Sequence, residues 1–357
     1  MITEYAIEQT PSAAIAMASA ESADPTSTFP HFVHLRLHSE YSIVDGLVRI
    51  DDVVKAAAND KQPALAMTDL ANLFGMVKFY KAARGKGIKP IVGCDVWITN
   101  DANRDNPSRL LLLVKNRLGY LQLCELLAQA WIENQHRGRA ELKFEWLQAI
   151  FEQQKEPGLI ALSGAHFGDI GCAIDNGNLD AAERNAQRWA SIFPQHFYIE
   201  IQRAGQPNME NHVRQAVDLA NRLGLPVMAT HPIQFINKED FTAHEARTCI
   251  AEGEMLANGR RVRRFNDQQC FKTQEEMLAL FSDLPGALQN AVEIAKRCSL
   301  TLELGKPKLP DFPTPDGMTI NEFLVAESKK GLEYRLTQVF PNEEKREQER
   351  ARYEAQA

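Results

Sequence analysis

Two histidines and an arginine share one face of the first strand that the sequence predicts. In the run FVHLRLH, His34, Arg36 and His38 are spaced two residues apart, so their side chains point the same way in an extended chain. A His-x-His pair on such a strand would be a strong signal for a metal site, because two imidazoles converge on one cation. Here the corresponding pair is Arg36 and His38, and an arginine is always protonated and cannot bind a metal. By itself this pattern favours a hydrogen-bonded structural histidine.

Three aspartates follow predicted strands or turns and could act as metal ligands or general bases. They are Asp45 in SIVDG, Asp69 in MTDLANLFG and Asp95 in GCDVW. Taken singly, an acid in such a place is more often a helix cap or a solvated loop residue. Because the three stand at successive strand ends, we expect them to share one pocket.

Strand-like and helix-like segments alternate from Phe32 onward. Seven short apolar runs are typical of strands: FVHLRLH, PALAMTD, IKPIVGCDVWI, RLLLLVKN, GLIALSG, HFYIEIQ and LPVMATH. Apolar residues at helical spacing stand between most of them, which predicts an α/β fold with a largely parallel sheet covered by helices. Polar residues at the carboxyl ends of the strands favour a closed barrel, because barrel enzymes build their sites there. These residues are His38, Asp69, Asp95, Gln202 and His231.

The two ends of the chain differ in character from the middle. Residues 1–30 are rich in Ala, Ser and Thr and have little periodicity, which predicts a disordered tail. The run GKPKLPDFPTPDG predicts a connector, and Thr319 and Glu322 have the spacing of a capping box that opens a helix. The charged run NEEKREQERARYEAQA has no helix stop signal and looks interrupted within a helix.

Composition excludes several classes of protein. The net charge of −7 argues against binding nucleic acid over the whole surface, so any such contact must be local. No stretch approaches the roughly 20 apolar residues of a membrane helix, and the start of the chain has no basic segment typical of a signal peptide. The six cysteines form no CxxC pair, which argues against a zinc ribbon or a redox motif and fits a cytoplasmic protein.

The segments HLRLHSEYSIVDGL, ALAMTDLANLFGMVKFY and GIKPIVG resemble the polymerase-and-histidinol-phosphatase (PHP) motifs of the bacterial replicative DNA polymerase III alpha subunit family. The resemblance continues through LLLLVKNRLGYLQL, NAVEIAKRC and LPDFPTPDG, and covers nearly everything from Phe32 onward. It implies a distorted, TIM-like (β/α)7 barrel of the PHP type over residues 31–285. It also implies that residues 286–357 are a connector and the truncated, helical start of the polymerase palm region.

Active PHP phosphoesterases hold a metal cluster that activates hydroxide for attack on a phosphate, and the resemblance implies that most of its ligands are missing here. His38, Asp45 and Asp69 match family ligands, and Asp95 is a shorter replacement for a Glu. At the other ligand positions this chain has Arg36, Leu70, Arg109, Ala165, Ala204 and the run His231-Pro232-Ile233-Gln234.

The remaining groups predict a vestigial metal site without a cofactor. Three clustered carboxylates with no cation would repel one another, whereas arginines can pair with them through two hydrogen bonds each. We therefore expect Arg36 and Arg109 to replace the metals as a structural ion-pair network with the aspartates. A second hypothesis keeps an active metal-dependent phosphoesterase or 3′-5′ exonuclease, with Zn²⁺ or Mn²⁺ bound by unconventional ligands such as His166 or His231.

The favoured function is an interaction and stability module of a DNA-directed DNA polymerase. The resemblance implies a proofreading exonuclease subunit and other holoenzyme subunits as partners. It also implies Mg²⁺ and DNA contacts in a polymerase core that this sequence does not reach, so the chain alone should not polymerise DNA. A third hypothesis is a truncated, non-catalytic gene product.

One dense basic run stands in NGRRVRRFND: Arg260, Arg261, Arg263 and Arg264. It could contact DNA phosphates or a partner, although a solvated loop is the favoured interpretation.

Overall fold

The computed structural model describes residues 31–354 except 153–157, 308, 310–311 and 316. The chain divides into two compact units, one reaching to Thr301 and one from Leu302 onward. The tail predicted for residues 1–30 lies outside the described residues.

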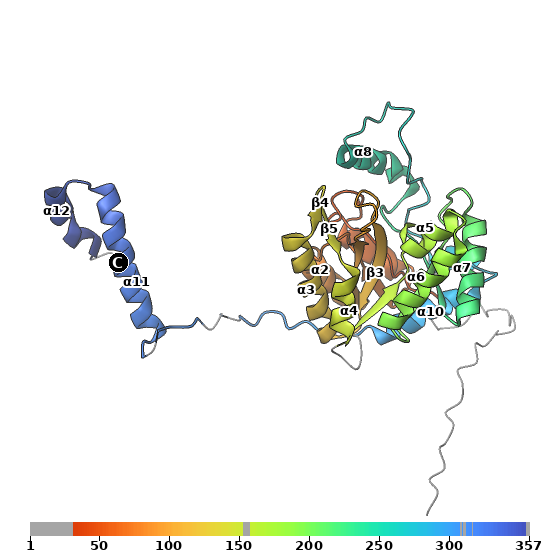
Figure 1. Ribbon diagram of the computed structural model, residues 1–357, viewed down its shortest axis with the longest axis horizontal. Helices are drawn as coiled ribbons and strands as arrows, with labels where there is room; N and C mark the ends of the chain where they lie inside the picture. The colour runs from red at the N-terminus through yellow and green to blue at the C-terminus, as the bar shows by residue number, and fades with distance from the viewer. Residues whose placement is uncertain (1–30, 153–157, 308, 310–311, 316, 355–357) are drawn as a thin grey trace, which may run out of the picture. The chain divides into compact units, whose positions relative to one another are not determined.

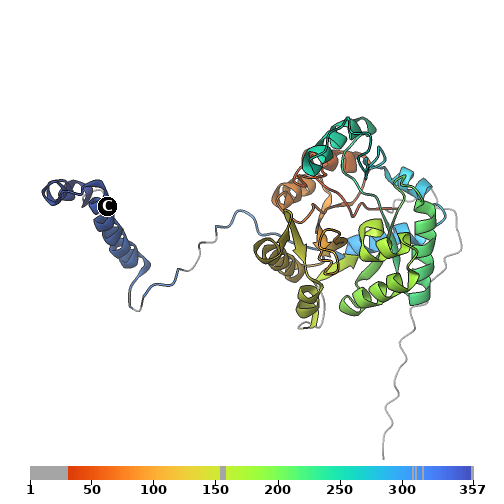
Figure 2. The ribbon, with the colours of Figure 1, turned by 45° about the horizontal axis from the view of Figure 1, so that its top comes forward.

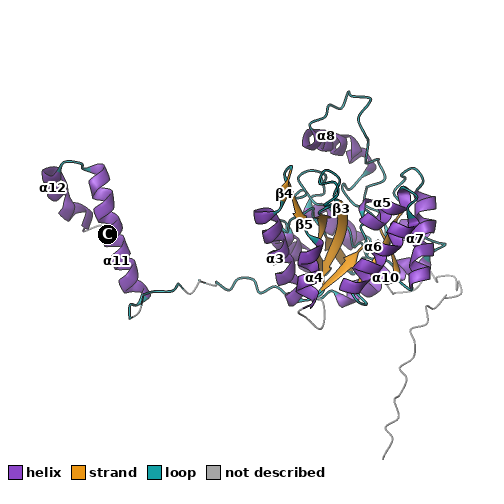
Figure 3. Ribbon diagram, viewed as in Figure 1, coloured by secondary structure: helices purple, strands orange, loops and turns teal. Residues whose placement is uncertain are grey.

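Six strands of the first unit form most of a barrel (Figures 1 and 3): β1 (Ala64–Met67), β2 (Lys89–Ile98), β3 (Ser108–Val114), β6 (Leu159–Leu162), β7 (Phe197–Gln202) and β8 (Val227–Thr230). They pair in the order β1, β2, β3, β6, β7, β8. All side chains of β1, β6 and β7 are buried, as their apolar sequences predict.

An extended segment at residues 33–38 closes the ring between β1 and β8. On one side the amide N–H groups of Ala66 and Thr68 donate to the carbonyl oxygens of His34 and Leu37, each at 2.9 Å. On the other side the N–H of His38 donates to the carbonyl oxygen of Ile233 at 2.9 Å. The seven predicted strand segments therefore make a closed, distorted barrel, and helices surround it in the turned view of Figure 2.

The prediction of a largely parallel sheet is wrong for β3. This strand runs antiparallel to both of its neighbours, β2 and β6. The physical reason is the connection between β2 and β3, which contains no helix and is too short for the crossover that parallel neighbours need. As a result Arg109, the second residue of β3, lies opposite Trp97 near the carboxyl end of β2. The sequence did not predict a small hairpin of β4 (Gln135–His136) and β5 (Arg139–Leu142). Its strand β5 pairs in parallel with the carboxyl end of β2.

Amphipathic helices cover the barrel. In α1 (Ile50–Asn59) the buried residues Ile50, Val53, Val54 and Ala57 form one apolar face, and α7 (Met209–Leu223) ends at Gly224 with a positive φ of 66°. The other helices of this unit are α2 (Met76–Gly85), α3 (Arg117–Glu133), α4 (Phe144–Glu152), α5 (Asp169–Asp175), α6 (Leu179–Ile192), α8 (Phe241–Glu252), α9 (Gln274–Leu280) and α10 (Pro285–Arg297), with short 3₁₀ turns at Ala165–Phe167 and Lys238–Asp240.

Helix α10 belongs to the first unit, although the domain boundary was expected at residue 285. The Nδ2 of Asn290 donates to the carbonyl oxygen of Val227 in β8 at 2.7 Å, and Leu288, Ala291 and Ile294 are buried. The compact unit therefore continues to Thr301.

The second unit contains α11 (Ile320–Val339) and α12 (Glu343–Glu354), which an ion pair between Glu333 and Arg350 joins. The predicted capping box of Thr319 and Glu322 is confirmed at the start of α11. In the part of the chain that the structure describes, no helix has the length and apolar character needed to span a membrane.

Candidate functional site

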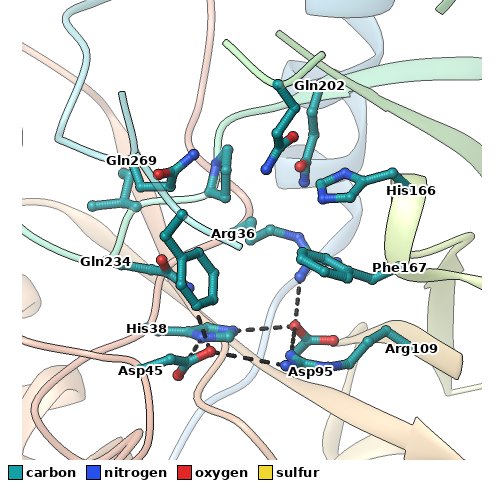
Figure 4. Close-up of a pocket in the computed structure, with 14 residues that line it drawn as sticks. Arg36, His38, Asp45, Asp95, Arg109, His166, Phe167, Gln202, Gln234 and Gln269 are labelled. Atoms are coloured by element: carbon teal, nitrogen blue, oxygen red, sulfur yellow. Dashed lines mark hydrogen bonds and ion pairs between the residues drawn. The ribbon is translucent and has the colours of Figure 1, made fainter. Parts of the chain in front are cut away.

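Charged side chains from four segments of the barrel meet in one buried pocket (Figure 4). Arg36 and His38 come from the extended closing segment, Asp95 from β2, Arg109 from β3 and Asp45 from the loop after His38. All five are buried. The structure thus brings together five of the six residues that the sequence assigned to the vestigial site and its ion pairs.

Asp95 is the centre of this cluster. Its Oδ2 accepts hydrogen bonds from Nη1 of Arg36 at 2.5 Å and Nη1 of Arg109 at 2.7 Å, and it lies 3.2 Å from Nε2 of His38. Burial alone would raise the pKa of Asp95, but Arg36, Arg109 and His38 together hold it well below its usual range. Asp95 is therefore an anion at neutral pH, and three cationic groups share its charge.

His38 lies between two carboxylates. Its Nδ1 is 3.0 Å from Oδ1 of Asp45, and its Nε2 faces Asp95. Burial opposes protonation of the ring, but Asp45 and then Asp95 outweigh it and raise the pKa of His38 to about 9. His38 is therefore an imidazolium at neutral pH that donates from both ring nitrogens, and in this form it cannot be a metal ligand.

Glu200 of β7 completes the network, and the sequence reasoning missed it. Its carboxylate accepts two hydrogen bonds from Arg36, from Nε at 2.8 Å and from Nη2 at 3.1 Å. The N–H of Gly164 and the hydroxyl of Thr230 also donate to it, at 3.1 and 2.5 Å. The signal was present in FYIEIQ, where Glu200 and Gln202 are the polar residues of an otherwise apolar strand and share its inner face.

The charges of the network balance. Arg36, Arg109 and the His38 imidazolium contribute +3, and Asp45, Asp95 and Glu200 contribute −3. Arg109 also contacts an aromatic face, because its guanidinium carbon lies 4.0 Å from the ring centre of Trp97. Such a desolvated cation over an indole ring is stabilising.

Asp69 does not join this network. Its carboxylate accepts hydrogen bonds from the backbone N–H of Ser39 at 2.6 Å and from the Ser39 hydroxyl at 2.9 Å, and it is absent from the pocket lining. Burial raises the pKa of Asp69 to about 6. The expectation that all three aspartates share one pocket therefore needs correction. The Asp69 carboxylate accepts its hydrogen bonds from Ser39 and not from the cations of the pocket.

The two alternative histidine ligands lie in different places. His166 lines the pocket, neither of its ring nitrogens has a hydrogen-bond partner among the described residues, and burial lowers its pKa to about 4. His231 lies outside the lining, with Nε2 2.8 Å from the carbonyl oxygen of Gln268. Burial lowers the pKa of His231 to about 3. Only His166 is positioned to meet a ligand in the pocket.

The residues present do not fit a metal ion. Within residues 31–354, outside the gaps named above, no three or more His, Cys, Asp or Glu side chains are grouped so that they could hold one. Oδ2 of Asp95 is already bonded to two guanidinium groups, and Oδ1 of the same carboxylate is buried without a hydrogen-bond partner among the described residues. A divalent cation at Oδ2 would have to displace at least one arginine and would be repelled by the other.

Three of the four arginines in the basic run of residues 260–264 pair with acids of α8. Arg261 and Arg263 pair with the same Glu245, the latter at 3.4 Å, and Arg264 lies 3.8 Å from Glu252. Arg260 is exposed. The two glutamates reduce the positive charge of the run without cancelling it.

Comparison with known proteins agrees with the expected family. Residues 34–204 match the family model described as the PHP domain. The chain is 50% identical over 313 residues to the DNA polymerase III subunit alpha of Pseudomonas fluorescens, covering 87% of this chain and 26% of that protein. It is 49% identical over 321 residues to the subunit of Neisseria meningitidis serogroup A, covering 89% and 28%. It is 42% identical over 325 residues to that of Escherichia coli K12, covering 91% and 28%.

Among solved structures, an amidohydrolase from Chromobacterium violaceum with bound sulfate and no metal is similar at 15% identity and a TM-score of 0.42, covering 60% of this chain and 96% of that one. This likeness is too low to carry an inference about the chain. The chain spans about a quarter of the length of the curated relatives it matches. Residues 34–204 therefore belong to the PHP domain family, in a chain homologous to the bacterial DNA polymerase III alpha subunit.

Proposed function

We propose that this chain is the N-terminal part of a replicative DNA polymerase III alpha subunit, and that its PHP domain is a structural and docking module without phosphoesterase activity. The observation that carries the proposal is the bonding of Asp95. Two arginines and His38 surround its carboxylate, so the aspartate at the centre of the pocket is committed to ion pairs.

The network has a structural task that fits such a module. It ties the extended closing segment to β2, β3 and β7 through Arg36 and Arg109, and these segments are far apart in the sequence. A metal cluster would supply cations at this end of the barrel, and here guanidinium groups supply them. Removing one partner of a buried ion pair leaves an uncompensated charge and is strongly destabilising.

The remaining functional assignments follow from the relatives. In the whole protein we place DNA-directed DNA polymerisation, with its Mg²⁺ and the DNA contacts of the catalytic site, in the part of the relatives that this chain does not span. We assign residues 31–301 to the PHP domain, and residues from Leu302 onward to the connector and the start of the polymerase core. The proposed partners of this cytoplasmic subunit are a proofreading exonuclease and the other holoenzyme subunits.

Metal analysis of the purified chain tests the proposal. After growth with zinc and manganese and purification without chelators, elemental mass spectrometry should find less than about a tenth of an equivalent of either metal, because the ligands are occupied. Hydrolysis of a chromogenic phosphodiester with added Mn²⁺ or Zn²⁺ should equal that of an Asp95→Asn variant. One or more bound equivalents, with hydrolysis that disappears in Asp95→Asn or His166→Ala, would establish the phosphoesterase in its place.

A further inference from the structure

The segment from α2 into β2 has the longest series of basic residues without an intervening acid in the sequence. Between Leu70 and Cys94 there are five basic residues and no acid, although the chain as a whole carries −7. Lys81, Arg84 and Lys86 of this stretch are exposed. Among the residues that the structure describes, only its first cation, Lys78, forms an ion pair, with Glu40 at 3.0 Å.

Two further cations extend this surface at the same end of the barrel. The Nζ of Lys89, the first residue of β2, donates to the carbonyl oxygen of Ala295 at 2.9 Å and to the Ser299 hydroxyl at 3.2 Å, which places it against the end of α10. Arg297 follows in α10 and donates to the Tyr198 hydroxyl at 2.7 Å. We call the set of Lys81, Arg84, Lys86, Lys89 and Arg297 the basic end of the barrel.

The positive charge of this surface is uncompensated. In the described part of the chain none of its five cations forms an ion pair, and the hydrogen bonds that they make go to carbonyl or hydroxyl groups. The neighbouring ion pair of Lys296 and Glu293 adds no net charge to this surface. The carboxyl ends of α2 and α10 contribute only about half a negative charge each, so a clear positive excess remains.

The basic end of the barrel is separate from the pocket. Lys89 is the first residue of β2 and Asp95 the seventh, so about 20 Å of strand lies between them. A ligand on this surface would therefore not compete with the ion-pair network. Binding at the basic end of the barrel is independent of the docking role proposed above.

The chemistry of this surface favours a phosphate backbone over a protein partner. Protein partners are anchored by apolar or aromatic side chains in pockets. The exposed large apolar side chains nearest in sequence to these cations are Val77 in α2, Leu118 at the start of α3 and Leu304, each with about 40% of its surface exposed, and none of them lines a pocket in the described part of the chain. A nucleic-acid backbone needs only cations that replace its counterions. We propose that the basic end of the barrel binds the phosphate backbone of DNA without sequence preference.

The salt dependence of binding tests this proposal quantitatively. Affinity of the full chain for a fluorescein-labelled DNA duplex would be measured by anisotropy at several salt concentrations. Each phosphate contact contributes about −0.9 to the slope of log K against log salt. Replacing three cations, in Lys81→Ala/Arg84→Ala/Lys86→Ala, should reduce the magnitude of the slope by about 2.7. The matched control, Arg260→Ala/Arg263→Ala/Arg264→Ala, removes the same charge from three exposed arginines of the run at residues 260–264 and should leave the slope unchanged.

The outcomes separate the possible partners. A smaller salt slope in Lys81→Ala/Arg84→Ala/Lys86→Ala, the α2 variant, with an unchanged slope in the control supports the proposal. The proposal would be overturned if the salt slope fell only in the control or fell equally in both variants. It would also be overturned if the unmodified chain did not bind the duplex measurably. Displacement of the DNA by a polyglutamate peptide at equal charge concentration would assign this surface to an acidic protein segment, and would also overturn it. Circular dichroism of both variants should match that of the unmodified chain, because the replaced side chains are exposed.

Discussion

Arg36 and Glu200 face each other across the inside of the barrel through two hydrogen bonds, of 2.8 and 3.1 Å. The paired side chains are separated by 164 positions in the sequence, and both are buried. The same guanidinium also bonds to Asp95 at 2.5 Å. One side chain thus fixes the relative positions of the closing segment, β2 and β7.

Replacing Arg36 should therefore destabilise the first unit strongly. We expect Arg36→Ala to lower the free energy of unfolding by about 3–5 kcal/mol, because Asp95 and Glu200 would lose a buried cation. Urea unfolding followed by circular dichroism measures the change. Arg222→Ala is the control, because Arg222 is half exposed and lies 3.6 Å from Glu183, and it should cost less than about 1 kcal/mol. Similar costs for the two variants would contradict the structural role of Arg36.

A double-mutant cycle should show that Arg36 and Glu200 act together. Arg36→Met and Glu200→Gln each leave a buried charge without its partner, whereas the double variant removes both charges. The sum of the single losses should exceed the loss in the double variant by about 0.5–3 kcal/mol. Additive losses would mean that Glu200 is held by its other donors, Gly164, Gln202 and Thr230, rather than by Arg36.

His38 should make stability depend on pH above neutrality. Its folded pKa of about 9 is above its ordinary value of 6.5, so the protonated ring stabilises the folded chain fully below about pH 6.5. This contribution should be lost as the pH rises through about 9. Unfolding free energies at pH 6, 8 and 10 should fall more for the unmodified chain than for His38→Gln. Parallel curves for the two proteins would exclude His38 as the titrating group.

Chelators should not alter thermal stability. Since the cations of the pocket are arginines and an imidazolium, removal of metal leaves the network unchanged. We expect the same melting temperature with and without EDTA, and no increase on addition of Zn²⁺ or Mn²⁺, by differential scanning calorimetry. A lower melting temperature in EDTA that zinc restores would show that a metal contributes to folding.

Sequence reasoning found the strands and most of the pocket for a simple reason. The strands are buried and therefore apolar, and Arg36 and His38 share a face because strand side chains alternate. The direction of β3 could not be obtained in this way, because an apolar run such as RLLLLVKN has the same composition in either direction.

Local sequence patterns also could not predict hydrogen-bond and ion-pair partners that only the folded chain brings together. Asp69 was expected in the pocket, but the loop after His38 brings Ser39 within 2.6 Å of it. Glu200 was not predicted, because a single acid in an apolar strand does not reveal which distant cation will lie opposite it. The dense run at Arg260–Arg264 was conspicuous in the sequence, yet three of its four arginines pair with acids of α8.

The packing of α10 on β8 has a consequence for protein engineering. A fragment that ends at residue 285, where the sequence suggests a boundary, would uncover β8 and lose the helix whose Leu288, Ala291 and Ile294 are buried. Exposed apolar strands of this kind promote aggregation. A fragment that ends at Thr301 keeps the helix, so it is the one that we expect to express in the soluble fraction and to crystallise as an independent barrel.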